Sequence, residues 1–354
     1  MLKITDIPGR ETVVDGKPYL FFSGFAYLGM PSLSVFQDTL AEGIRRYGAV
    51  YPSSRLSNTP LELYEAFERE LAAFTLQEAA LSFSSGYLAA SAAVRVCAKD
   101  SILLFGPSAH PSLKPQTANH KIFTSERWET EIATFLHESV GASHTIVLES
   151  VNPLTGRLQD LSWLANLRHP VRVLVDDSHG IGILGDGGAG IAALLPRIPS
   201  VRYMICFSLS KAFSCEGGVV AGGYDDITAL RQCPEFSAAT PMSPAFAYTW
   251  MQSGSVFDLQ RERLRRNVAY LYAGLSDRRL FLQDPRIPVC YTRESDFYFF
   301  CLKRSILLSA FTYPSASDPL VVRAVLNAMH TVRDLDSLVE SIDTYEREKN
   351  LYFR

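Results

Sequence analysis

The chain has 354 residues, of which 47% are hydrophobic and 20% are charged, and its formal net charge is −3. This balance is typical of a globular protein with a substantial core. No basic stretch is long enough to suggest nucleic-acid binding, and no run approaches the roughly 20 apolar residues needed to span a bilayer. The first residues lack the apolar core of a signal peptide, so we expect neither a leader nor a membrane span.

The six cysteines are scattered along the chain without a CxxC pair, and several lie inside apolar runs. A thiol in such a setting behaves as a small buried hydrophobic group. We therefore expect reduced, structural cysteines and a cytoplasmic protein. The seven histidines are equally dispersed, so no metal site is expected.

Two helices are predicted first, over residues 31–48 and 60–75, where apolar residues recur at helical spacing and a proline opens each stretch. After Gln77 the pattern changes to short, continuous apolar runs. These runs are EAALSFSS (78–85), SILLF (101–105), HTIVLES (144–150), VRVLVDD (171–177), YMICFS (203–208) and GVVAGG (218–223). Helical patterns or glycine turns separate them, which predicts a mostly parallel sheet covered by helices on both faces.

The rest of the chain is predicted to form a long helix from Pro244 to about Asp277, strands near 294–302 and a final amphipathic helix near 334–343. The expected fold is α/β, with a large doubly wound domain and a small C-terminal α/β domain. The expected divisions are an N-terminal segment (1–44) that packs with the small domain, the large domain (45–243), the connecting helix (244–278) and the small domain (279–354).

Polar or ionisable residues follow five of the predicted strands. They are Ser85, Gly86 and Tyr87; His110; Glu149; Asp176, Asp177, Ser178 and His179; and Ser208, Ser210 and Lys211. In an open α/β sheet, ligands bind beyond the carboxyl ends of the strands. We therefore expect these side chains to share one site.

These residue types fit one cofactor, pyridoxal phosphate. Its aldehyde needs a lysine to hold it as a Schiff base, and its pyridine nitrogen needs a carboxylate to keep it protonated, which suits Lys211 and Asp176. Its phosphate needs backbone N–H groups and hydroxyls at a helix N-terminus, which suits residues 85–87 together with Ser208. Its ring needs a flat face, which suits His110. A lysine in this role must lose its proton at neutral pH, and burial favours that loss.

The motifs resemble those of the α-oxoamine synthases, a family of fold-type-I pyridoxal phosphate enzymes that includes 8-amino-7-oxononanoate synthase and serine palmitoyltransferase. The resemblance covers nearly the whole chain, from FAYLGM to AMHT. VDDSHGIGILGDGGAG resembles the segment with the pyridine-nitrogen aspartate, which implies that role for Asp176 and a contact of His179 with the ring hydroxyl. SLSKAFSCEGG resembles the Schiff-base segment, which implies that Lys211 is the catalytic lysine and Ser208 a phosphate ligand. FSSGYLA resembles the phosphate-binding helix start, and PSAHPSL carries the stacking histidine, His110.

The resemblance also implies a reaction and an assembly. The family condenses an amino acid with an acyl thioester, usually acyl-CoA, with decarboxylation, to give an α-amino ketone. The main alternative is an aminotransferase that uses the same residues and needs no acyl donor. The family further implies a homodimer with shared active sites, in which Ser237 or Thr240 reaches the partner's phosphate. A scaffold without activity is disfavoured because Lys211, Asp176 and His110 are all retained.

Three departures from the family pattern concern substrate recognition. Residues 50–52 (VYP) fill a loop that is normally glycine-rich, and Phe25 replaces an asparagine that helps to hold the amino-acid carboxylate. Val321 replaces an arginine that grips the same carboxylate, and a valine cannot replace its charged hydrogen bonds. Either Arg323 or Arg55 takes over this role, or the substrate is not an ordinary α-amino acid. Together, the three departures indicate either a different substrate or an enzyme of lower activity.

Some residues have simpler interpretations. Glu149 is either part of the cofactor site or an exposed strand-end carboxylate, and Tyr87 is either a core residue or contributes only its backbone N–H. The GxGxxG match over 180–185 does not directly follow a strand or open a helix, which argues against a dinucleotide site. The SxxK match over 208–211 lacks the accompanying KTG-like and SDN-like motifs of serine acyl-enzymes.

Overall fold

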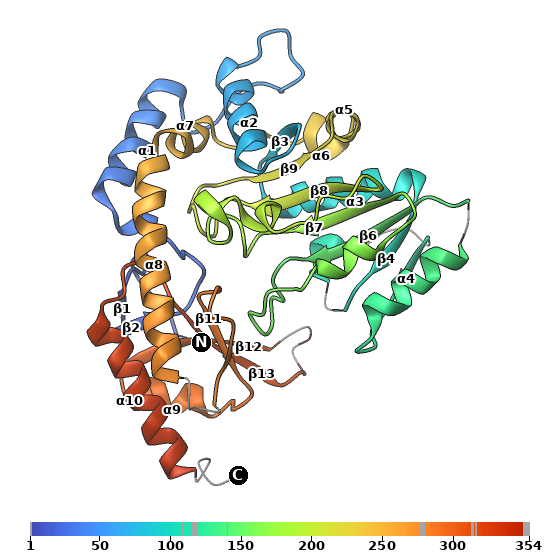
Figure 1. Cartoon of the computed structure of the whole chain (residues 1–354). Coiled ribbons are helices and arrows are strands. Elements are labelled where there is room, and N and C mark those ends of the chain that lie inside the picture. The colour runs from blue at the N-terminus through green and yellow to red at the C-terminus, as the bar shows by residue number, and fades with distance from the viewer. Residues whose placement is uncertain are drawn as a thin grey trace.

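The computed structural model describes residues 2–107, 109–114, 119–139, 141–275, 280–312, 315 and 317–349. Two sheets organise the described chain (Figure 1), one of seven strands in the order β3-β9-β8-β7-β6-β4-β5 and one of six in the order β1-β2-β12-β13-β11-β10. The long helix α8 (Gly254–Leu275) runs from beside the first sheet to the second.

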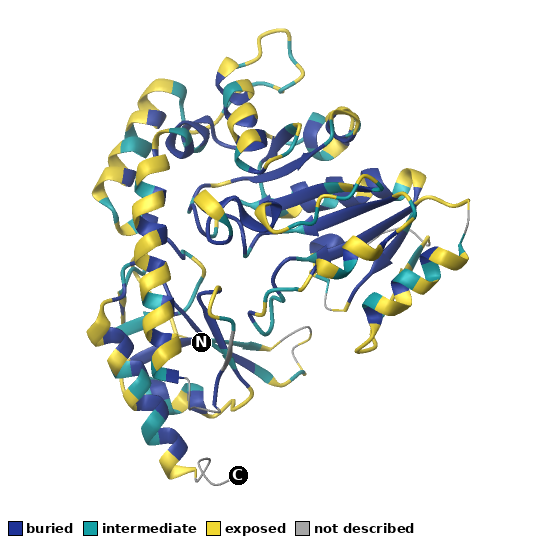
Figure 2. Ribbon diagram, in the orientation of Figure 1, coloured by how far each residue is buried: buried dark blue, intermediate teal, exposed yellow. Residues whose placement is uncertain are grey.

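The large sheet consists of β3 (Ala79–Phe83), β4 (Ile102–Phe105), β5 (His120–Ile122), β6 (His144–Glu149), β7 (Val171–Asp176), β8 (Val201–Ser208) and β9 (Gly218–Gly222). Its pairs are parallel except where β9 lies antiparallel to β3 and β8. The predicted mostly parallel α/β sheet is therefore confirmed. Apart from the short edge strand β5, which has two exposed residues, its strands are mainly apolar and buried because helices cover both faces, and Figure 2 shows the central strands in dark blue.

Alternate residues of these strands pack into two separate hydrophobic clusters, one on each face of the sheet. Helix α3 (Gly86–Asp100) packs into one cluster, and α4 (Trp128–Glu138) packs into the other. The remaining helices beside this sheet are α2 (Glu62–Phe74), α5 (Tyr224–Arg231), α6 (Pro234–Ser237) and α7 (Pro244–Gln252), with 3-10 turns η2 (Pro111–Leu113), η3 (Ser162–Asn166), η4 (Asp186–Gly188) and η5 (Gly190–Ala193).

The six-stranded sheet joins the two ends of the chain. It consists of β1 (Glu11–Val14), β2 (Lys17–Phe22), β10 (Leu282–Gln283), β11 (Val289–Thr292), β12 (Ile306–Thr312) and β13 (Leu320–Val325), and β2 pairs in parallel with β12. The helices α9 (Phe297–Lys303) and α10 (Val332–Glu348) lie beside it. Because β2 from the N-terminal part of the chain pairs with β12, the turn after β2 and strand β13 belong to the same sheet. Figure 1 shows this sheet beside the large one.

The predicted strand near residues 294–302 is wrong, because this segment forms α9. Its aromatic residues favour strands by intrinsic propensity. The buried positions nevertheless follow a helical spacing, since Phe297 and Cys301 are fully buried while Phe299 between them is exposed. Tertiary packing therefore overrides the local preference.

The two predicted N-terminal helices are present as α1 (Ser34–Tyr47) and α2. Their prolines do not open them, however. Pro31 lies in the preceding 3-10 turn η1 (Met30–Ser32), and Pro60 lies two residues before α2 begins. Leu33 and Leu61 are the N-cap residues in extended conformation.

Helix α8 touches both parts of the fold. The Nε atom of Arg261 donates to the carbonyl oxygen of Gly182 at 2.9 Å, beside the large sheet. Two turns further on, the Nδ2 atom of Asn267 donates to the carbonyl oxygens of Asn327 and His330, which follow β13. In the described ranges, no helix combines the length and apolar character required to cross a membrane.

Candidate active site

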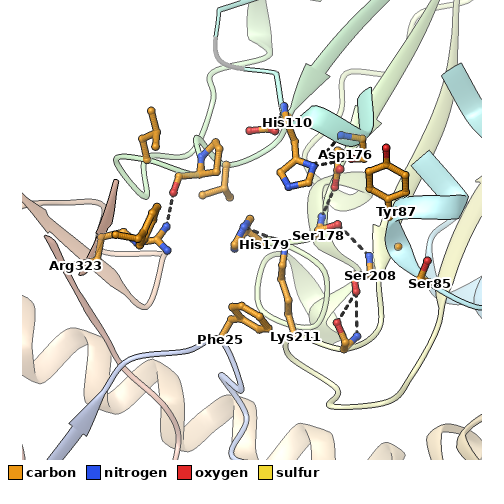
Figure 3. A pocket seen from close by; sticks show the side chains of 18 residues that line it. Phe25, Ser85, Tyr87, His110, Asp176, Ser178, His179, Ser208, Lys211 and Arg323 are labelled. Atoms are coloured by element: carbon orange, nitrogen blue, oxygen red, sulfur yellow. Dashed lines mark hydrogen bonds between the residues drawn. The ribbon is translucent and has the colours of Figure 1, made fainter. Parts of the chain in front are cut away.

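A cavity of about 430 Å³ lies beyond the carboxyl ends of β6, β7 and β8, where β12 and β13 of the second sheet also contribute side chains. Figure 3 shows it from close by. The structure brings most of the predicted site residues together in its wall: Phe25, Ser85, Gly86, Tyr87, His110, Glu149, Asp176, His179, Ser208, Lys211 and Arg323. We call this cavity the active-site pocket. Three predicted residues, Arg55, Ser237 and Thr240, do not line it.

Lys211 projects into the pocket from the turn between β8 and β9. Its buried neighbours Leu209 and Ala212 anchor this turn, and Leu209 exchanges backbone hydrogen bonds with Gly217 and Cys215. The Nζ atom lies 3.0 Å from the Nε2 atom of His179. Burial lowers the pKa of the Lys211 amine, because the charged form loses its hydration. This shift favours the unprotonated, nucleophilic amine.

Two carboxylates face each other across the ends of adjacent strands. Glu149 on β6 and Asp176 on β7 are in register, and an oxygen of Glu149 accepts a hydrogen bond from the backbone N–H of His110 at 2.7 Å. Burial, and then the neighbouring Asp176 charge, raise the pKa of Glu149 to about 8. Glu149 is therefore a half-buried pocket residue and not an exposed strand-end group.

His179 has a partner on each ring nitrogen. Its Nδ1 atom lies 2.8 Å from the hydroxyl of Tyr27, and its Nε2 atom contacts Lys211. Burial and then the Lys211 charge lower the pKa of His179 well below its ordinary value, so the ring is neutral at physiological pH. Tyr27 is almost fully buried and was not identified from the sequence, although it lies in the FAYLGM segment where the family resemblance begins.

His110 presents a neutral ring to the pocket. Its Nδ1 atom accepts from the backbone N–H of Ser112 at 3.2 Å and lies 2.7 Å from the Ser112 hydroxyl. Burial lowers the pKa of His110. A neutral aromatic ring whose edge is fixed by Ser112 is suited to stacking on a planar ligand.

The N-terminus of α3 forms an anion cradle. Ser85 caps this helix by accepting the backbone N–H of Leu88, and N–H groups of the first turn have no intrahelical partner. A Cβ atom on Gly86 would come within 2.6 Å of Ser208 Cβ, so only glycine allows the helix start to lie against this hydroxyl. Ser210, whose hydroxyl is 2.7 Å from that of Ser208, also lines the pocket.

The opposite wall carries one cationic group. Arg323 on β13 donates to the carbonyl oxygen of Pro153 and lies over the ring of Phe311, 4.7 Å from its centre. Its Nε atom is buried without a hydrogen-bond partner among the described residues. Val321, two positions earlier on the strand, is buried and does not line the pocket.

Arg55, the other arginine considered for the carboxylate, is engaged elsewhere. Its guanidinium donates to Glu68 at 2.9 Å and to Ser82 at 3.0 Å, and it lies over the ring of Tyr64. The nearby loop residues 50–52 also lie outside the pocket wall. Of the two arginines, the structure therefore places only Arg323 in the pocket.

Asp177 explains the first glycine of the pattern that imitates a dinucleotide motif, and also Gly190, which lies outside that pattern. Its carboxylate is fully buried and accepts the backbone N–H of Ile191 at 2.8 Å. A Cβ atom on Gly180 or Gly190 would lie only 2.1 or 1.9 Å from the carboxylate oxygens. The loop thus wraps around a buried carboxylate, and it continues into the 3-10 turns η4 and η5, without an α-helix between it and β8.

Pyridoxal phosphate fits this set of groups. The Lys211 amine, whose pKa burial lowers, the Asp176 carboxylate and the neutral His110 ring match the aldehyde, the pyridine nitrogen and the flat face of the cofactor. The cradle formed by Gly86 and Ser208 matches its phosphate.

Comparisons with known proteins agree with the sequence motifs. The family model for aminotransferase class I and II matches residues 26–342. An 8-amino-7-oxononanoate synthase of Lysinibacillus sphaericus is 26% identical, over 96% of this chain and 92% of its own. Another, of Thioalkalivibrio sulfidiphilus, is 28% identical over 95% and 91%. A serine palmitoyltransferase structure from S. paucimobilis matches with a TM-score of 0.84 at 18% identity, over 99% of this chain and 93% of that one. The predicted resemblance to the α-oxoamine synthases is thereby confirmed.

Proposed function

The chain belongs to the aminotransferase class I and II family, and from this premise we propose that it is a pyridoxal-phosphate-dependent acyltransferase of the α-oxoamine synthase type. It condenses an amino acid with an acyl thioester such as acyl-CoA, with decarboxylation, and forms an α-amino ketone. The observation that carries this proposal is the convergence of Lys211, Asp176, His179 and His110 in one pocket. The nearly full-length match to 8-amino-7-oxononanoate synthases supports the reaction type.

When bound, pyridoxal phosphate supplies an electron sink for negative charge at the Cα atom of an amine. Lys211 would hold its aldehyde carbon, and burial, which lowers the pKa of this amine, favours the unprotonated form that such a bond requires. Asp176 keeps a proton on the pyridine nitrogen. His179, fixed by Tyr27, orients the Lys211 amine. With substrate bound, the Lys211 amine would be placed to move the proton at Cα as a general base or acid.

The remaining pocket residues bind and orient. The start of α3, together with Ser208, would bind the phosphate, and the His110 ring would stack on the cofactor. Glu149 lies beside Asp176 and fixes the backbone of His110 through its hydrogen bond. The neutral state of His110 and His179 avoids repulsion of the protonated pyridine ring.

We propose that Arg323 binds the carboxylate of the amino substrate. It is the arginine that lines the pocket, and its Nε donor has no partner among the described residues. A buried donor without a partner is costly, and a carboxylate would satisfy it. This assignment keeps the substrate an ordinary α-amino acid despite the valine at position 321.

The alternative, an aminotransferase, is not favoured. The family model includes that class by name, but the relatives that match nearly the whole chain are synthases. An aminotransferase would also turn over without any acyl donor, and this difference is measurable.

We further propose that the protein is a cytoplasmic homodimer. Ser237 at the end of α6 and Thr240 just after it lie outside the chain's own pocket wall, which suits a contact with the partner's phosphate. All six cysteines are buried thiols, as expected in a reducing compartment. Sedimentation of the holoprotein tests the dimer.

The decisive experiment offers the holoprotein a panel of amino acids with and without acyl-CoA. Release of the CoA thiol, measured with a thiol reagent, together with an α-amino ketone detected by mass spectrometry supports the acyltransferase. The Lys211→Ala variant, which lacks the catalytic amine, should release no thiol above background. Formation of a keto acid without consumption of acyl-CoA would instead establish the aminotransferase.

A further inference from the structure

A second cavity, of about 320 Å³, adjoins the active-site pocket and is not used by the chemistry described above. The two cavities share Phe25 and Ser210 in their walls. The second cavity is bounded by the N-terminal segment, by the turn after β2, by residues that follow Lys211 and by the end of β13. We call it the N-terminal cavity.

The walls of the N-terminal cavity are mainly apolar. They include Ile7, Pro8, Phe21, Pro31 and Leu326. Among the described residues that line it there is no lysine, arginine or histidine, and its charged group is the exposed carboxylate of Glu216. An apolar chain would gain from burial here, whereas a terminal carboxylate would lose its hydration and meet a like charge.

Phe25 stands at the junction of the two cavities. Its carbonyl oxygen accepts the backbone N–H of Tyr27 at 2.8 Å, and Tyr27 in turn contacts His179. The backbone of this turn is therefore tied to the catalytic group, while the Phe25 ring remains 47% exposed. Figure 3 shows Phe25 and Lys211 both in the pocket wall. A large apolar ring here, where the resemblance implies asparagine, extends the apolar surface to the reacting groups.

We propose that the N-terminal cavity receives the acyl chain of the thioester, and that Phe25 is the specificity-determining residue at its entrance. The preferred acyl group is an unbranched apolar chain without a terminal charge. This inference rests on the proposed function and names the class of its acyl donor. The amino substrate is held elsewhere, because Arg323 does not line the N-terminal cavity.

The first test is the chain-length dependence of kcat/KM for butyryl-, hexanoyl- and octanoyl-CoA with the holoprotein. Burial of each methylene in an apolar cavity should raise kcat/KM about fourfold. Octanedioyl-CoA has the same chain length as octanoyl-CoA but ends in a carboxylate, and its kcat/KM should be well below that of octanoyl-CoA. Equal values for all thioesters, or a length dependence on the amino-acid side chain instead, would overturn the proposal.

Two variants locate the effect in the cavity. Ala26 lines the N-terminal cavity but not the active-site pocket, so Ala26→Trp should lower kcat/KM for octanoyl-CoA at least tenfold and leave acetyl-CoA unchanged. Ala26→Ser keeps the space and is the matched control. Ile7 is 77% exposed at the rim, so Ile7→Arg should fold normally and raise the use of octanedioyl-CoA. Wild-type selectivity in both Ala26→Trp and Ile7→Arg would overturn the assignment.

Direct binding separates this inference from the proposed function. The probe is the unreactive thioether octyl-CoA, titrated calorimetrically into holoprotein without amino acid. Binding that Ala26→Trp abolishes and Ala26→Ser retains supports the cavity even if no thioester is turned over, in which case only the reaction assignment fails. Absence of binding, or equal binding to both variants, rejects the cavity assignment.

Discussion

The two sides of the active-site pocket are built in different ways. One side, the cofactor side, consists of Asp176, His110, His179, Lys211 and Ser208 beyond the buried strands of the large sheet. The other, the substrate side, consists of Phe25, Phe311 and Arg323 from the N-terminal turn and the second sheet. Of the three departures from the family pattern, only Phe25 lies in the pocket wall, and it falls on the substrate side. On the proposed assignment, the packing of the parallel strands positions the residues for the cofactor chemistry, and the N-terminal turn and second sheet position those that select the substrate.

The largest effect is expected from Lys211→Ala on the cofactor side. Loss of the amine that moves the proton should lower kcat by about 10³-fold or more with every substrate. The measurement is thiol release under saturating substrates, with the visible absorption of the cofactor as a second readout. Thr228→Ala, at an exposed position of α5 outside both cavities, serves as the control for folding. Substantial residual turnover in Lys211→Ala would break the division between the two sides.

Asp176→Asn should cause the next largest loss, about 10²-fold or more in kcat. An amide cannot keep the pyridine nitrogen protonated, so the electron sink weakens while the shape of the pocket is retained. Asp186→Asn, at an exposed position of η4, is the matched control and should behave as wild type. A variant in which KM rises and kcat is unchanged would move Asp176 to the substrate side.

Changes on the substrate side should alter selectivity more than chemistry. Arg323→Met removes charged hydrogen bonds that contribute about 1.5–3 kcal/mol, so KM for the amino acid should rise roughly 10- to 100-fold. KM for acyl-CoA should stay constant. Arg55→Met is the contrasting variant: it removes the shorter of the two ion pairs of the buried Glu68, leaves the pair with Arg231 at 3.6 Å, and should lower stability with little change in KM. A higher KM in Arg55→Met, with loss of stability alone in Arg323→Met, would show that Arg55 binds the carboxylate instead.

The smallest effect concerns the buried carboxylate behind the cofactor side. Burial raises the pKa of Asp177 to about 7, above its value in the unfolded chain, so the folded state binds the extra proton. The free energy of unfolding should therefore decrease as pH rises, by at most about 2 kcal/mol between pH 5 and 7. Asp177→Asn should remove this part of the slope in urea titrations at several pH values. An unchanged slope would show that another group titrates there.

The cofactor side could be predicted from the sequence because it depends on local order. Lys211, Asp176 and Glu149 each end an apolar run, and parallel strands must bring such ends to one edge. Tyr27 could not be found this way, since its contact with His179 depends on a turn 152 positions earlier in the chain. The pairing of Arg55 with Glu68 likewise depends on how α2 packs. The helix at 297–303 was missed because its aromatic composition favours a strand.

Helix α8 fixes the distance between the two sides, because it is hydrogen-bonded to both. Arg261 is hydrogen-bonded to the loop that follows His179. Asn267 is hydrogen-bonded to the segment after β13, the strand that carries Arg323. Deletion of one residue between them would shorten the helix by about 1.5 Å and turn its far end by about 100°, which would carry Asn267 away from its acceptors. The number of residues between Arg261 and Asn267 therefore sets the distance between the loop that follows His179 and the chain that follows β13.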